Sequence, residues 1–385
     1  MPFRDFYGGE CTNYKSIFIT LSFNTHRTVH NDHSPNGHIN GHKSKKMKKK
    51  IIFVINLISG TSSKAGIPDI IDRELDKQQF DYEIVTTQYA GHATEIATKA
   101  KNDGIDIVVA IGGDGTVNEV ARAIVHSNTA LGIIPCGSGN GLARHLLLPM
   151  NVHKCIELIN TCEIRDLDYG IINGYPFFCT CGMGFDAFIS QKFAEAGKRG
   201  PITYAENILR EGLKYKPETY ILEDESGTHK YKAFLISCAN ASQYGNNAYI
   251  APQASMSDGL LDVVIMEPFD AFEAPQVSID MFNKTLDRNS KIKTFRCRKL
   301  HIHRNSPGAI HYDGDPVTTG EDIDVELQPK GIKIIVNPYA DRSLRQPNAL
   351  QTAAAEMFND INAIRENISQ QSKHIQEVLL KKFNL

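Results

Sequence analysis

The sequence predicts an α/β protein in which a parallel-sheet domain is followed by a β-rich domain and a C-terminal helix. From Ile51 to about residue 166, short apolar runs alternate with stretches of helical periodicity, which is typical of βαβ units around a parallel sheet. After about Leu167, candidate strands follow one another and are interrupted by Gly, Pro and Asn, which favours antiparallel pairing.

The apolar runs of the first part are expected to form buried strands, with helices between them. The run IIFVIN, which begins at Ile51, is continuously apolar, like a strand that is buried on both faces of a parallel sheet. Pro68 stands near the start of the first helix, where no N–H is needed, and Gly104 closes the second helix. Strands are expected at 51–56, 81–88, 105–113 and 131–137, and helices at 67–79, 92–104, 116–127 and 140–148.

The second part is expected to contain mostly strands, with one helical insertion at 187–214. A final strand is expected near Ile332, where the run IKIIVNP begins. The other candidate strands lie within 169–184, 228–241, 259–268, 298–305, 308–315 and 322–328.

The two ends of the chain differ from the rest. Residues 1–48 carry five histidines among Asn, Ser and Gly and end in KSKKMKKK. Their low apolar content predicts a disordered extension, with a metal-binding or anionic-lipid-binding tail as the alternative; Met47 is a candidate for the true start. Residues 345–385 carry apolar side chains at heptad spacing, which predicts either a coiled coil and a homodimer or a helix packed on its own domain.

Composition and charge argue against several classes of protein. The formal net charge of the 385 residues is −2, so no overall positive field favours nucleic acid. The eight cysteines form no CxxC pair, which argues against a zinc ribbon and favours reduced thiols in a cytoplasmic protein. No apolar run approaches the roughly 18 residues of a membrane span, and no cleavage site follows the short run SIFITLSF. Contact with a membrane is therefore expected to be peripheral.

Three glycine-bearing turns follow strands of the first part: NLISG at 56–60, GGDGTVNE at 112–119 and PCGSGNG at 135–141. A parallel strand that ends in such a turn before a helix presents backbone N–H groups to an anion, and glycine lets the backbone approach a phosphate. Because the carboxyl ends of parallel strands meet at one edge of a sheet, the turns predict a nucleotide-binding crevice. Asp114 beside a phosphate indicates Mg²⁺ or a proton acceptor, or else a helix cap.

Five motifs in order, GGDGTVNEV, PCGSGNGLAR, CGMGFDA, SDGLLDV and YDGD, resemble the diacylglycerol kinase and sphingosine kinase superfamily over about residues 50–338. GGDGT alone also resembles NAD kinases and phosphofructokinases, whereas the ordered set is far more specific. The resemblance implies a nucleotide-binding domain of residues 49–166, completed by a returning strand at 330–340, and a β-sandwich domain for the lipid at 167–329. It also implies ATP and Mg²⁺ as cofactors and an active site between the two domains.

The resemblance assigns a nucleotide-binding role to residues of the glycine-bearing turns and to one threonine. Leu57 replaces the usual proline of the first turn, which leaves the polar contacts of that turn possible. The implied nucleotide-binding residues are Asn56, Ser59, Gly60, Thr87, Gly112, Gly113, Asp114, Gly115, Thr116, Asn118, Glu119, Gly137, Ser138 and Asn140.

The resemblance also implies catalytic and metal-binding residues. Asp313 and Asp315 of YDGD, together with Asp114, are the candidates for the base that accepts the proton of the lipid hydroxyl. Asp315 replaces the usual glutamate, and the residues DGDP also suit a type I turn. The implied structural Mg²⁺ site consists of the Asp258 side chain and the backbone of Ser255 and Leu260.

The identity of the lipid depends on two smaller features. The run SGN at 138–140 is closer to sphingosine kinases than to diacylglycerol-type members, and Asp186 in GFDA is a candidate partner of a sphingoid amine, although GFDA also occurs in bacterial diacylglycerol-type members. The sequence therefore slightly favours an ATP-dependent kinase of a sphingoid base, with diacylglycerol close behind. The alternatives are an NAD kinase-like enzyme and a non-catalytic lipid-binding or scaffold protein.

Overall fold

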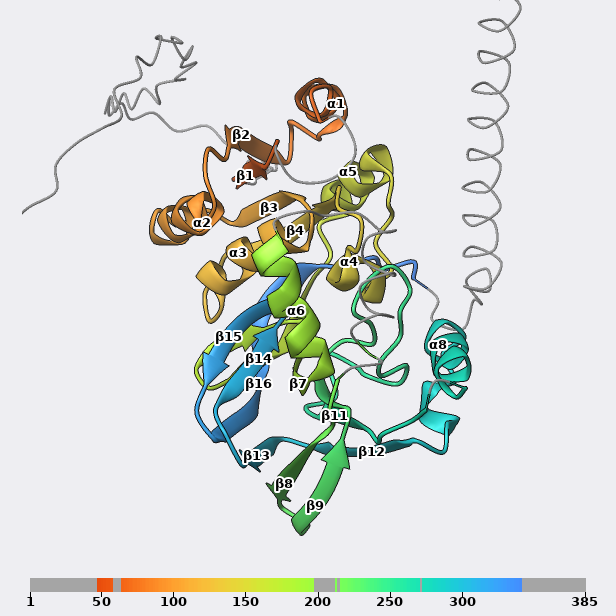
Figure 1. Cartoon of the computed structure of the whole chain (residues 1–385). Helices are drawn as coiled ribbons and strands as arrows, with labels where there is room; N and C mark the ends of the chain where they lie inside the picture. Colours follow the sequence, from red (N-terminus) through yellow and green to blue (C-terminus); the bar gives the residue numbers. More distant parts are fainter. Residues whose placement is uncertain (1–46, 58–63, 197–211, 213–214, 271, 341–385) are drawn as a thin grey trace, which may run out of the picture. The chain divides into compact units, whose positions relative to one another are not determined.

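The computed structural model of the chain (Figure 1) describes residues 47–57, 64–196, 212, 215–270 and 272–340. Several sequence predictions lie outside these residues. They concern the extension up to residue 46, Ser59 and Gly60 of the first turn, most of the insertion after residue 196, and the heptad segment 345–385.

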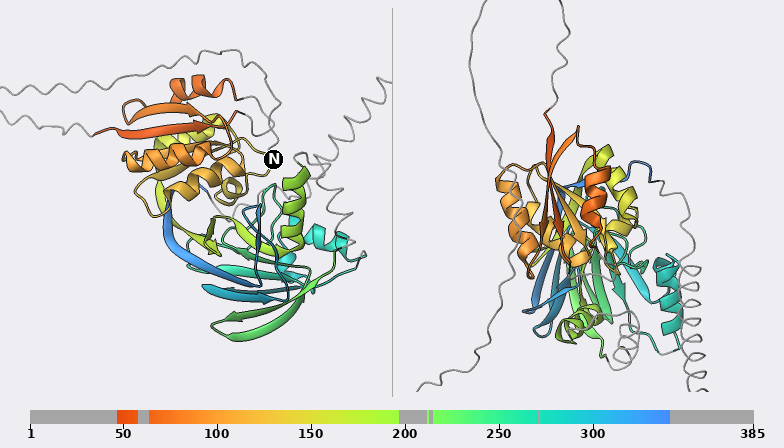
Figure 2. Two further views of the ribbon diagram at one scale, coloured as in Figure 1. Left: turned by 60° about the vertical axis from the view of Figure 1, so that its left-hand side comes forward. Right: turned by 90° about the horizontal axis from the view of Figure 1, so that it is seen from above.

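The first part of the chain is a parallel sheet between two layers of helices (Figures 1 and 2). Its strands are ordered β2-β1-β3-β4 and all neighbours run parallel, as the alternation of strands and helices predicts. The strands are β1 Lys49–Ile55, β2 Phe80–Thr86, β3 Ile107–Gly112 and β4 Ala130–Pro135, and the helices are α1 Ile67–Glu74, α2 His92–Asn102, α3 Asp114–Ile124, α4 Gly141–His145 and α5 Val152–Thr161.

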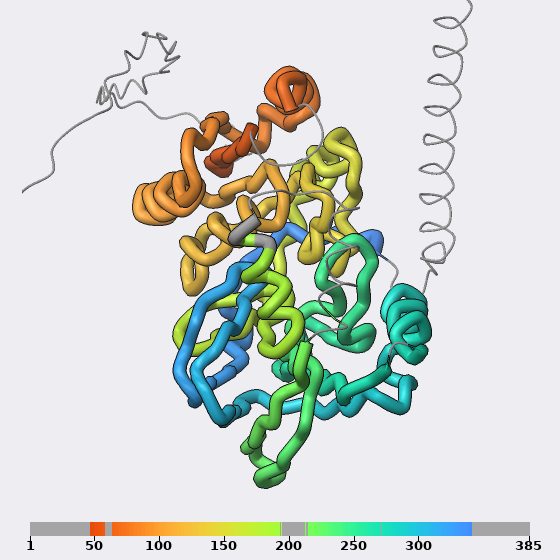
Figure 3. Tube along the Cα trace, in the orientation of Figure 1, coloured from red at the N-terminus to blue at the C-terminus, as the bar shows by residue number. Residues whose placement is uncertain are grey.

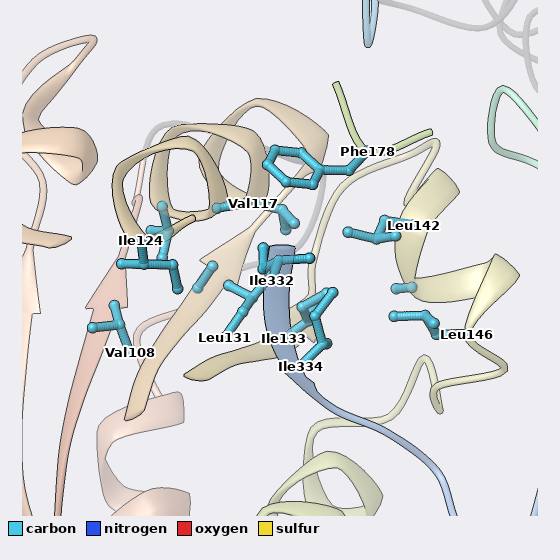
Figure 4. Close-up of a cluster of buried hydrophobic side chains, with 14 of the residues drawn as sticks. Val108, Val117, Ile124, Leu131, Ile133, Leu142, Leu146, Phe178, Ile332 and Ile334 are labelled. Atoms are coloured by element: carbon cyan, nitrogen blue, oxygen red, sulfur yellow. The ribbon is translucent and has the colours of Figure 1, made fainter. Parts of the chain in front are cut away.

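The two faces of this sheet pack on different helices. Phe53 and Val109 lie in a core with α1 and α5, whereas Val54 and Val108 lie in a core with α2 and α3. Figure 4 draws part of the second core, in which side chains of α3 meet those of β3 and β4. Every residue of β3 and β4 is buried, which is why both strands read as continuous apolar runs.

The helix ends follow the expected capping signals. Pro68 lies in the first turn of α1, and Gly104, with φ +69°, follows the C-cap of α2. Helix α5 was not predicted; it begins after Asn151, whose side chain accepts a hydrogen bond from the Lys154 N–H at 3.2 Å.

The second part of the chain is rich in strands, and the pairings among them are antiparallel, as predicted. One six-stranded sheet has the order β12-β11-β10-β7-β14-β15; the other strands extend the sheet of the first part through β16, β13, β8 and β9, with β5 and β6 beside β16. The strands are β5 Ile164–Ile172, β6 Tyr175–Phe177, β7 Thr180–Gly184, β8 Glu218–Asp224, β9 Gly227–Ala233, β10 Leu235–Ala239, β11 Leu261–Met266, β12 Ile292–Cys297, β13 Lys299–Arg304, β14 Gly308–Tyr312, β15 Asp315–Thr319 and β16 Asp322–Ile335.

Three helical segments accompany these strands: α6 Phe185–Ala196, α8 Ala274–Phe282 and the 3-10 helix η1 Leu286–Arg288. Helix α6 contains the start of the expected insertion but begins two residues earlier. Helix α8, the 3-10 helix η1 and strands β8, β12 and β15 were not predicted. The candidate strand 169–184 is divided into β5, β6 and β7, with a turn at Asn173 and Gly174, both of positive φ.

A shared hydrophobic core joins the two sheets of the second part face to face. Tyr220, Ile302 and Val325 contribute to it from β8, β13 and β16. Met183 and Val263 contribute from β7 and β11 of the other sheet. Two sheets whose inner faces share one core form a β-sandwich.

Strand β16 connects the two parts, as its blue trace shows in Figure 3. Its first half pairs with β13, and near its end Ile334 pairs with Leu131 of β4 in parallel. The register against β5 shifts between Gln328 and Ile332, and Lys330 in this bulge has φ +52°. One strand thus belongs to both the sandwich and the α/β sheet.

Candidate active site

The turn between β3 and α3 and the turn between β4 and α4 lie backbone to backbone. A Cβ atom placed on Gly137 would come within 2.6 Å of the Cα of Gly113, closer than real side chains approach. Glycine is therefore required at this contact for the two turns to meet. The contact confirms that two of the three predicted turns come together at the carboxyl edge of the sheet.

Asp114 fastens the first of these turns to the second. Its Oδ2 accepts a hydrogen bond from the Asn140 N–H at 2.8 Å, and its Oδ1 accepts one from the Gly141 N–H at 2.7 Å. The carboxylate thus caps α4, the helix after the second turn, and not α3, in which it lies. Burial raises the pKa of Asp114 above its usual value, and the two N–H groups act in the opposite direction.

The second turn is closed by its own asparagine. Asn140 has φ +50°; its Oδ1 accepts from the Gly137 N–H at 2.9 Å and its Nδ2 donates to the Gly137 carbonyl at 2.7 Å. Ser138, at the tip of this turn, is exposed, as is Gly115 in the other turn. An anion above the two turns would therefore meet Ser138 and Gly115 first.

The first strand contributes a polar contact to the same edge. Asn56 donates from Nδ2 to the Thr116 hydroxyl at 3.1 Å, and its carbonyl accepts from the Lys64 ammonium. Gly112 makes room for Thr116, because a Cβ atom there would lie 2.5 Å from the threonine Oγ1. Burial lowers the pKa of Lys64. Asn56, Thr116 and Gly112 are thus brought together as predicted, with Lys64 as an addition.

Three further predicted nucleotide residues are buried or bound within the fold. The Glu119 carboxylate accepts from the N–H groups of Gly91 and Ala93, both at 3.1 Å, at the start of α2. Thr87 is buried after β2, and its N–H donates to the Ile55 carbonyl at 2.9 Å. Asn118 is buried in α3. Glu119 therefore ties α3 to the neighbouring helix.

Asp313 lies in the turn between β14 and β15, with φ +52°, and is bound by backbone groups. Its carboxylate accepts from the N–H groups of Phe178, Cys179 and Thr180, at 2.8, 2.7 and 3.2 Å. Burial raises the pKa of Asp313, and Arg122 and the three N–H groups oppose that effect. The charges of Asp313 and Asp114 both raise the pKa of the buried Cys179 thiol, beyond the larger effect of burial. Two of the three candidate bases thus act on one thiol.

Asp315 differs from the other two carboxylates because it forms an ion pair at the surface. Its Oδ2 lies 2.7 Å from Nη1 of Arg122, and its side chain is 51% exposed. Arg122 comes from α3, the helix that begins at the glycine-bearing turn. Its Nε donates to the Pro176 carbonyl at 3.2 Å and its Nη2 to the Tyr312 carbonyl at 3.3 Å.

Asp186, the predicted lipid contact, lies in a polar cluster between helix α6 and the sheet face formed by β7 and β14. Its Oδ2 lies 3.0 Å from Nε2 of His311 and 3.2 Å from the hydroxyl of Tyr244. The Gly314 N–H points to the other ring nitrogen of His311, Nδ1, at 3.4 Å. Gly182 makes room for this cluster, because a Cβ atom there would lie 2.5 Å from Asp186 Oδ2.

The predicted Mg²⁺ loop has oxygen donors, and an arginine lies beside it. Asp258 Oδ1 accepts from the Leu260 N–H at 3.2 Å, and its Oδ2 lies 3.6 Å from Arg296. The hydroxyl of Ser255 lies 3.2 Å from that of Ser257. Within the described ranges, no group of three or more His, Cys, Asp or Glu side chains is arranged to hold a metal ion. The donors fit Mg²⁺ in kind, one carboxylate with carbonyl oxygens, and the site stays a prediction.

Sequence reasoning missed three residues that organise these loops. Arg122 stands between two alanines of a helix, where an isolated charge was the available signal. His311 precedes YDGD by one residue. Buried Asp168 accepts from the N–H groups of Gly259, at 2.9 Å, and Lys330, at 2.7 Å, so it ties the Mg²⁺ loop to the bulge of β16.

Membrane-spanning segments were searched for among the described residues, and none of their helices combines the length and apolar character that a crossing requires. The seven cysteines of this part of the chain are all free.

The arrangement matches known families in both parts of the chain. Residues 50–172 match the diacylglycerol kinase catalytic domain, and residues 179–336 match the YegS C-terminal NAD kinase beta sandwich-like domain. The two matches cover the α/β sheet with its turns and the sandwich with the carboxylates of YDGD.

Individual relatives agree with these matches. A protein of Staphylococcus saprophyticus named "Diacylglycerol kinase" is 23% identical over 274 residues, which are 70% of this chain and 90% of that protein. A protein of Chromohalobacter salexigens named "Probable lipid kinase YegS-like" is 27% identical over 236 residues, 60% of this chain and 76% of that one.

A solved structure shares the fold. The crystal structure of a protein of Bacillus anthracis described as a diacylglycerol kinase superposes with a TM-score of 0.60 at 20% identity, and covers 76% of this chain and 98% of that one. With a diacylglycerol kinase catalytic domain followed by the C-terminal domain of YegS, the chain belongs to the diacylglycerol kinase family of lipid kinases.

Proposed function

We propose that the protein transfers the γ-phosphoryl group of ATP–Mg²⁺ to the hydroxyl of a neutral lipid alcohol, with diacylglycerol as the first candidate. The observation that carries this proposal is the contact between the two glycine-bearing turns, which Asp114 fastens together at 2.7 and 2.8 Å. Preformed turns of this kind offer backbone N–H groups to phosphate oxygens without reorganisation. The Mg²⁺ that accompanies ATP would offset the charge of the carboxylates beside them.

Asp315 is the carboxylate we propose as the proton acceptor. Both oxygens of Asp114 and both oxygens of Asp313 already accept hydrogen bonds from backbone N–H groups. Asp315 contacts Arg122 through Oδ2 only, and its Oδ1 has no protein partner among the described residues. A base must reach the proton that it takes, so the half-exposed Asp315 suits that role better than the two bound carboxylates.

A neutral lipid suits the surroundings of Asp186 better than an amine does. The sequence favoured a sphingoid base partly because Asp186 could pair with its ammonium group. In the fold, Oδ2 of this carboxylate already lies near His311 and Tyr244, at 3.0 and 3.2 Å, and its side chain is only 11% exposed. An ammonium group would have to lose most of its water to reach this carboxylate, whereas diacylglycerol carries no charge to desolvate there. The relative from Staphylococcus saprophyticus is named "Diacylglycerol kinase", which supports the same choice.

The test is phosphate transfer by the full chain. Purified protein is incubated with Mg²⁺, γ-labelled ATP and mixed micelles that contain diacylglycerol, sphinganine, ceramide or monoacylglycerol, and separately with NAD. We expect label in diacylglycerol, and we expect Asp315→Asn to lower kcat by about 10²- to 10⁴-fold, the usual contribution of a general base.

Asp166→Asn is the matched control, because Asp166 also forms a half-exposed ion pair, with Lys333 at 2.6 Å, but lies on β5, which pairs with β16 and β6. Label that enters sphinganine alone would restore the sphingoid assignment. Label in NAD, or no transfer at all with ATP still bound, would replace the proposal by the NAD kinase-like or the scaffold alternative. Full activity of Asp315→Asn would remove Asp315 as the base.

A further inference from the structure

The geometry points to Arg122 as a positioning residue that holds the acceptor carboxylate of Asp315 in place relative to the nucleotide turns. The inference rests on the proposed function for its kinetic part, and its structural part stands alone. Arg122 and Asp315 are 193 residues apart in the chain and meet at 2.7 Å.

The guanidinium group of Arg122 makes several contacts, which together fix the position of the side chain. Its guanidinium donates to the carbonyls of Pro176 and Tyr312 as well as to Asp315, and lies 4.5 Å from the centre of the Tyr312 ring. The Tyr312 ring in turn stacks on Tyr175, with centroids 4.8 Å apart. The side chain of Arg122 is only 20% exposed, so these contacts are partly shielded from water.

These contacts require the planar guanidinium group of an arginine. Three different nitrogens of one planar group reach three acceptors that belong to β6, β14 and β15 or lie at their ends. A lysine ammonium could keep the charge beside Asp315 but could not reach all three acceptors and stack on the ring at once. The site is therefore specific for arginine and not merely for a positive charge.

Helix α3 connects this clamp to the nucleotide turns. Asp114, at the first residue of α3, fastens the two turns, and Arg122 lies eight residues later, about 12 Å along the helix axis. A short helix is stiff, so the distance between the turns and the acceptor carboxylate is set by one element. Phosphoryl transfer depends on placing donor and acceptor in line, and a misplacement of about 1 Å can cost 10²-fold in rate.

The kinetic test separates positioning from binding. We expect Arg122→Met to lower kcat for lipid phosphorylation by about a hundredfold while KM for ATP stays within about threefold, because the nucleotide turns do not contact Arg122. Arg122→Lys is expected to recover about tenfold of that loss through its charge alone. Arg73→Met is the control, since Arg73 forms an exposed ion pair with its neighbour Glu74 on α1.

A second measurement does not depend on activity. Hydrogen exchange of the backbone amides of residues 312–315 should be faster in Arg122→Met than in the wild type, and unchanged in Arg73→Met. An equal loss of kcat and of ATP binding, or unchanged exchange at 312–315, would overturn the inference. If the wild type phosphorylates no lipid, the proposed function fails, but the exchange experiment still decides whether Arg122 holds the turn.

Discussion

At the scale of single residues, three carboxylates that look alike in the sequence have different surroundings in the fold. Asp114 and Asp313 are partly buried and bound by backbone N–H groups, and burial raises the pKa of both. Asp315 pairs with Arg122 and is half exposed. The motifs locate all three residues, but only their partners divide them into two that are bound by backbone N–H groups and one that stays half exposed.

Glycine at 137 is required by the contact between the two turns, and this can be tested on stability alone. A Cβ atom at Gly137 would meet the Cα of Gly113 at 2.6 Å, whereas a Cβ atom at Gly115 has nothing within 4 Å. We expect Gly137→Ala to lower the free energy of unfolding in urea by about 1–3 kcal/mol, since backbone must move to admit the methyl group.

Gly115→Ala is the matched control in the same site. Gly115 lies in the first turn of α3 without positive φ, so alanine should leave stability unchanged or raise it by up to about 1 kcal/mol. Equal stability of the two variants would show that the turns do not depend on their close contact. If phosphate lies over Gly115, this variant should also bind ATP more weakly while remaining folded.

At the scale of elements, β13 and β16 carry a row of histidines and aspartates on their exposed face. His301 Nδ1 lies 2.8 Å from Asp324, and His303 Nδ1 lies 2.8 Å from Asp322. The hydrogen bond to Asp324 raises the pKa of His301, to which the charges of Asp322 and Glu223 also contribute. A pair of this kind favours the charged histidine in the folded state and not in the unfolded chain.

Stability should therefore depend on pH through this pair. Because the pKa of His301 is higher in the folded state, its contribution is complete below the unfolded value of about 6.5 and is lost as the pH rises through the folded value. We expect Asp324→Asn to lower the free energy of unfolding by a few tenths of a kcal/mol at pH 5.5 and by less at pH 9, since the pair is exposed.

Urea unfolding at the two pH values measures this difference. Asp166→Asn is the control, because its carboxylate pairs with a lysine, Lys333, and not with a histidine. A loss for Asp324→Asn that is the same at pH 5.5 and at pH 9 would contradict the assignment.

The elements also show what a sequence can and cannot predict. Strands β1, β3 and β4 were found because burial on both faces makes continuous apolar runs. Strand β8 was missed because only Tyr220 and Leu222 are buried, while the apolar Ile221 between them is exposed, so the sequence shows no clear alternation of apolar and polar residues. The glycine-bearing turns were located because each of them comes at the end of one of these apolar runs.

The contacts that give the site its shape could not be predicted. His311 and Asp186 are 125 residues apart, and Arg122 and Asp315 are 193 apart. Local sequence patterns do not predict contacts between residues that are so far apart in the chain. The same holds for Arg304, which is fully buried and donates to the carbonyls of Gly308 and Gly320 without a carboxylate partner in the described part of the chain.

At the scale of the whole molecule, β16 is shared by the α/β sheet and the sandwich. It pairs with β4 in the first and with β13 and β5 in the second. Removal of this strand would leave an unpaired edge on β4 in the first part and on β13 in the second. We therefore expect residues 47–340 to unfold in a single transition, although chains of this size often unfold domain by domain.

Tryptophan probes can test this, because the chain contains no tryptophan. Tyr82→Trp places a probe on β2, and Phe295→Trp places one on β12, both in partly buried positions beside a core. Urea unfolding that is followed by fluorescence of each variant and by circular dichroism should give coincident midpoints. Separate midpoints would show that the two parts unfold independently.

The position of β16 in the chain also affects synthesis. It is the last strand that the structure describes, so the ribosome releases residues 322–335 after every other described strand. Until then, the edge of β4 that faces away from β3 has no partner strand, and β13 lacks one of its two neighbouring strands. Unpaired strand edges can pair with strands of other chains, and this pairing leads to aggregation. A stop codon anywhere before residue 322 should therefore yield an aggregating product, not a smaller working nucleotide-binding protein.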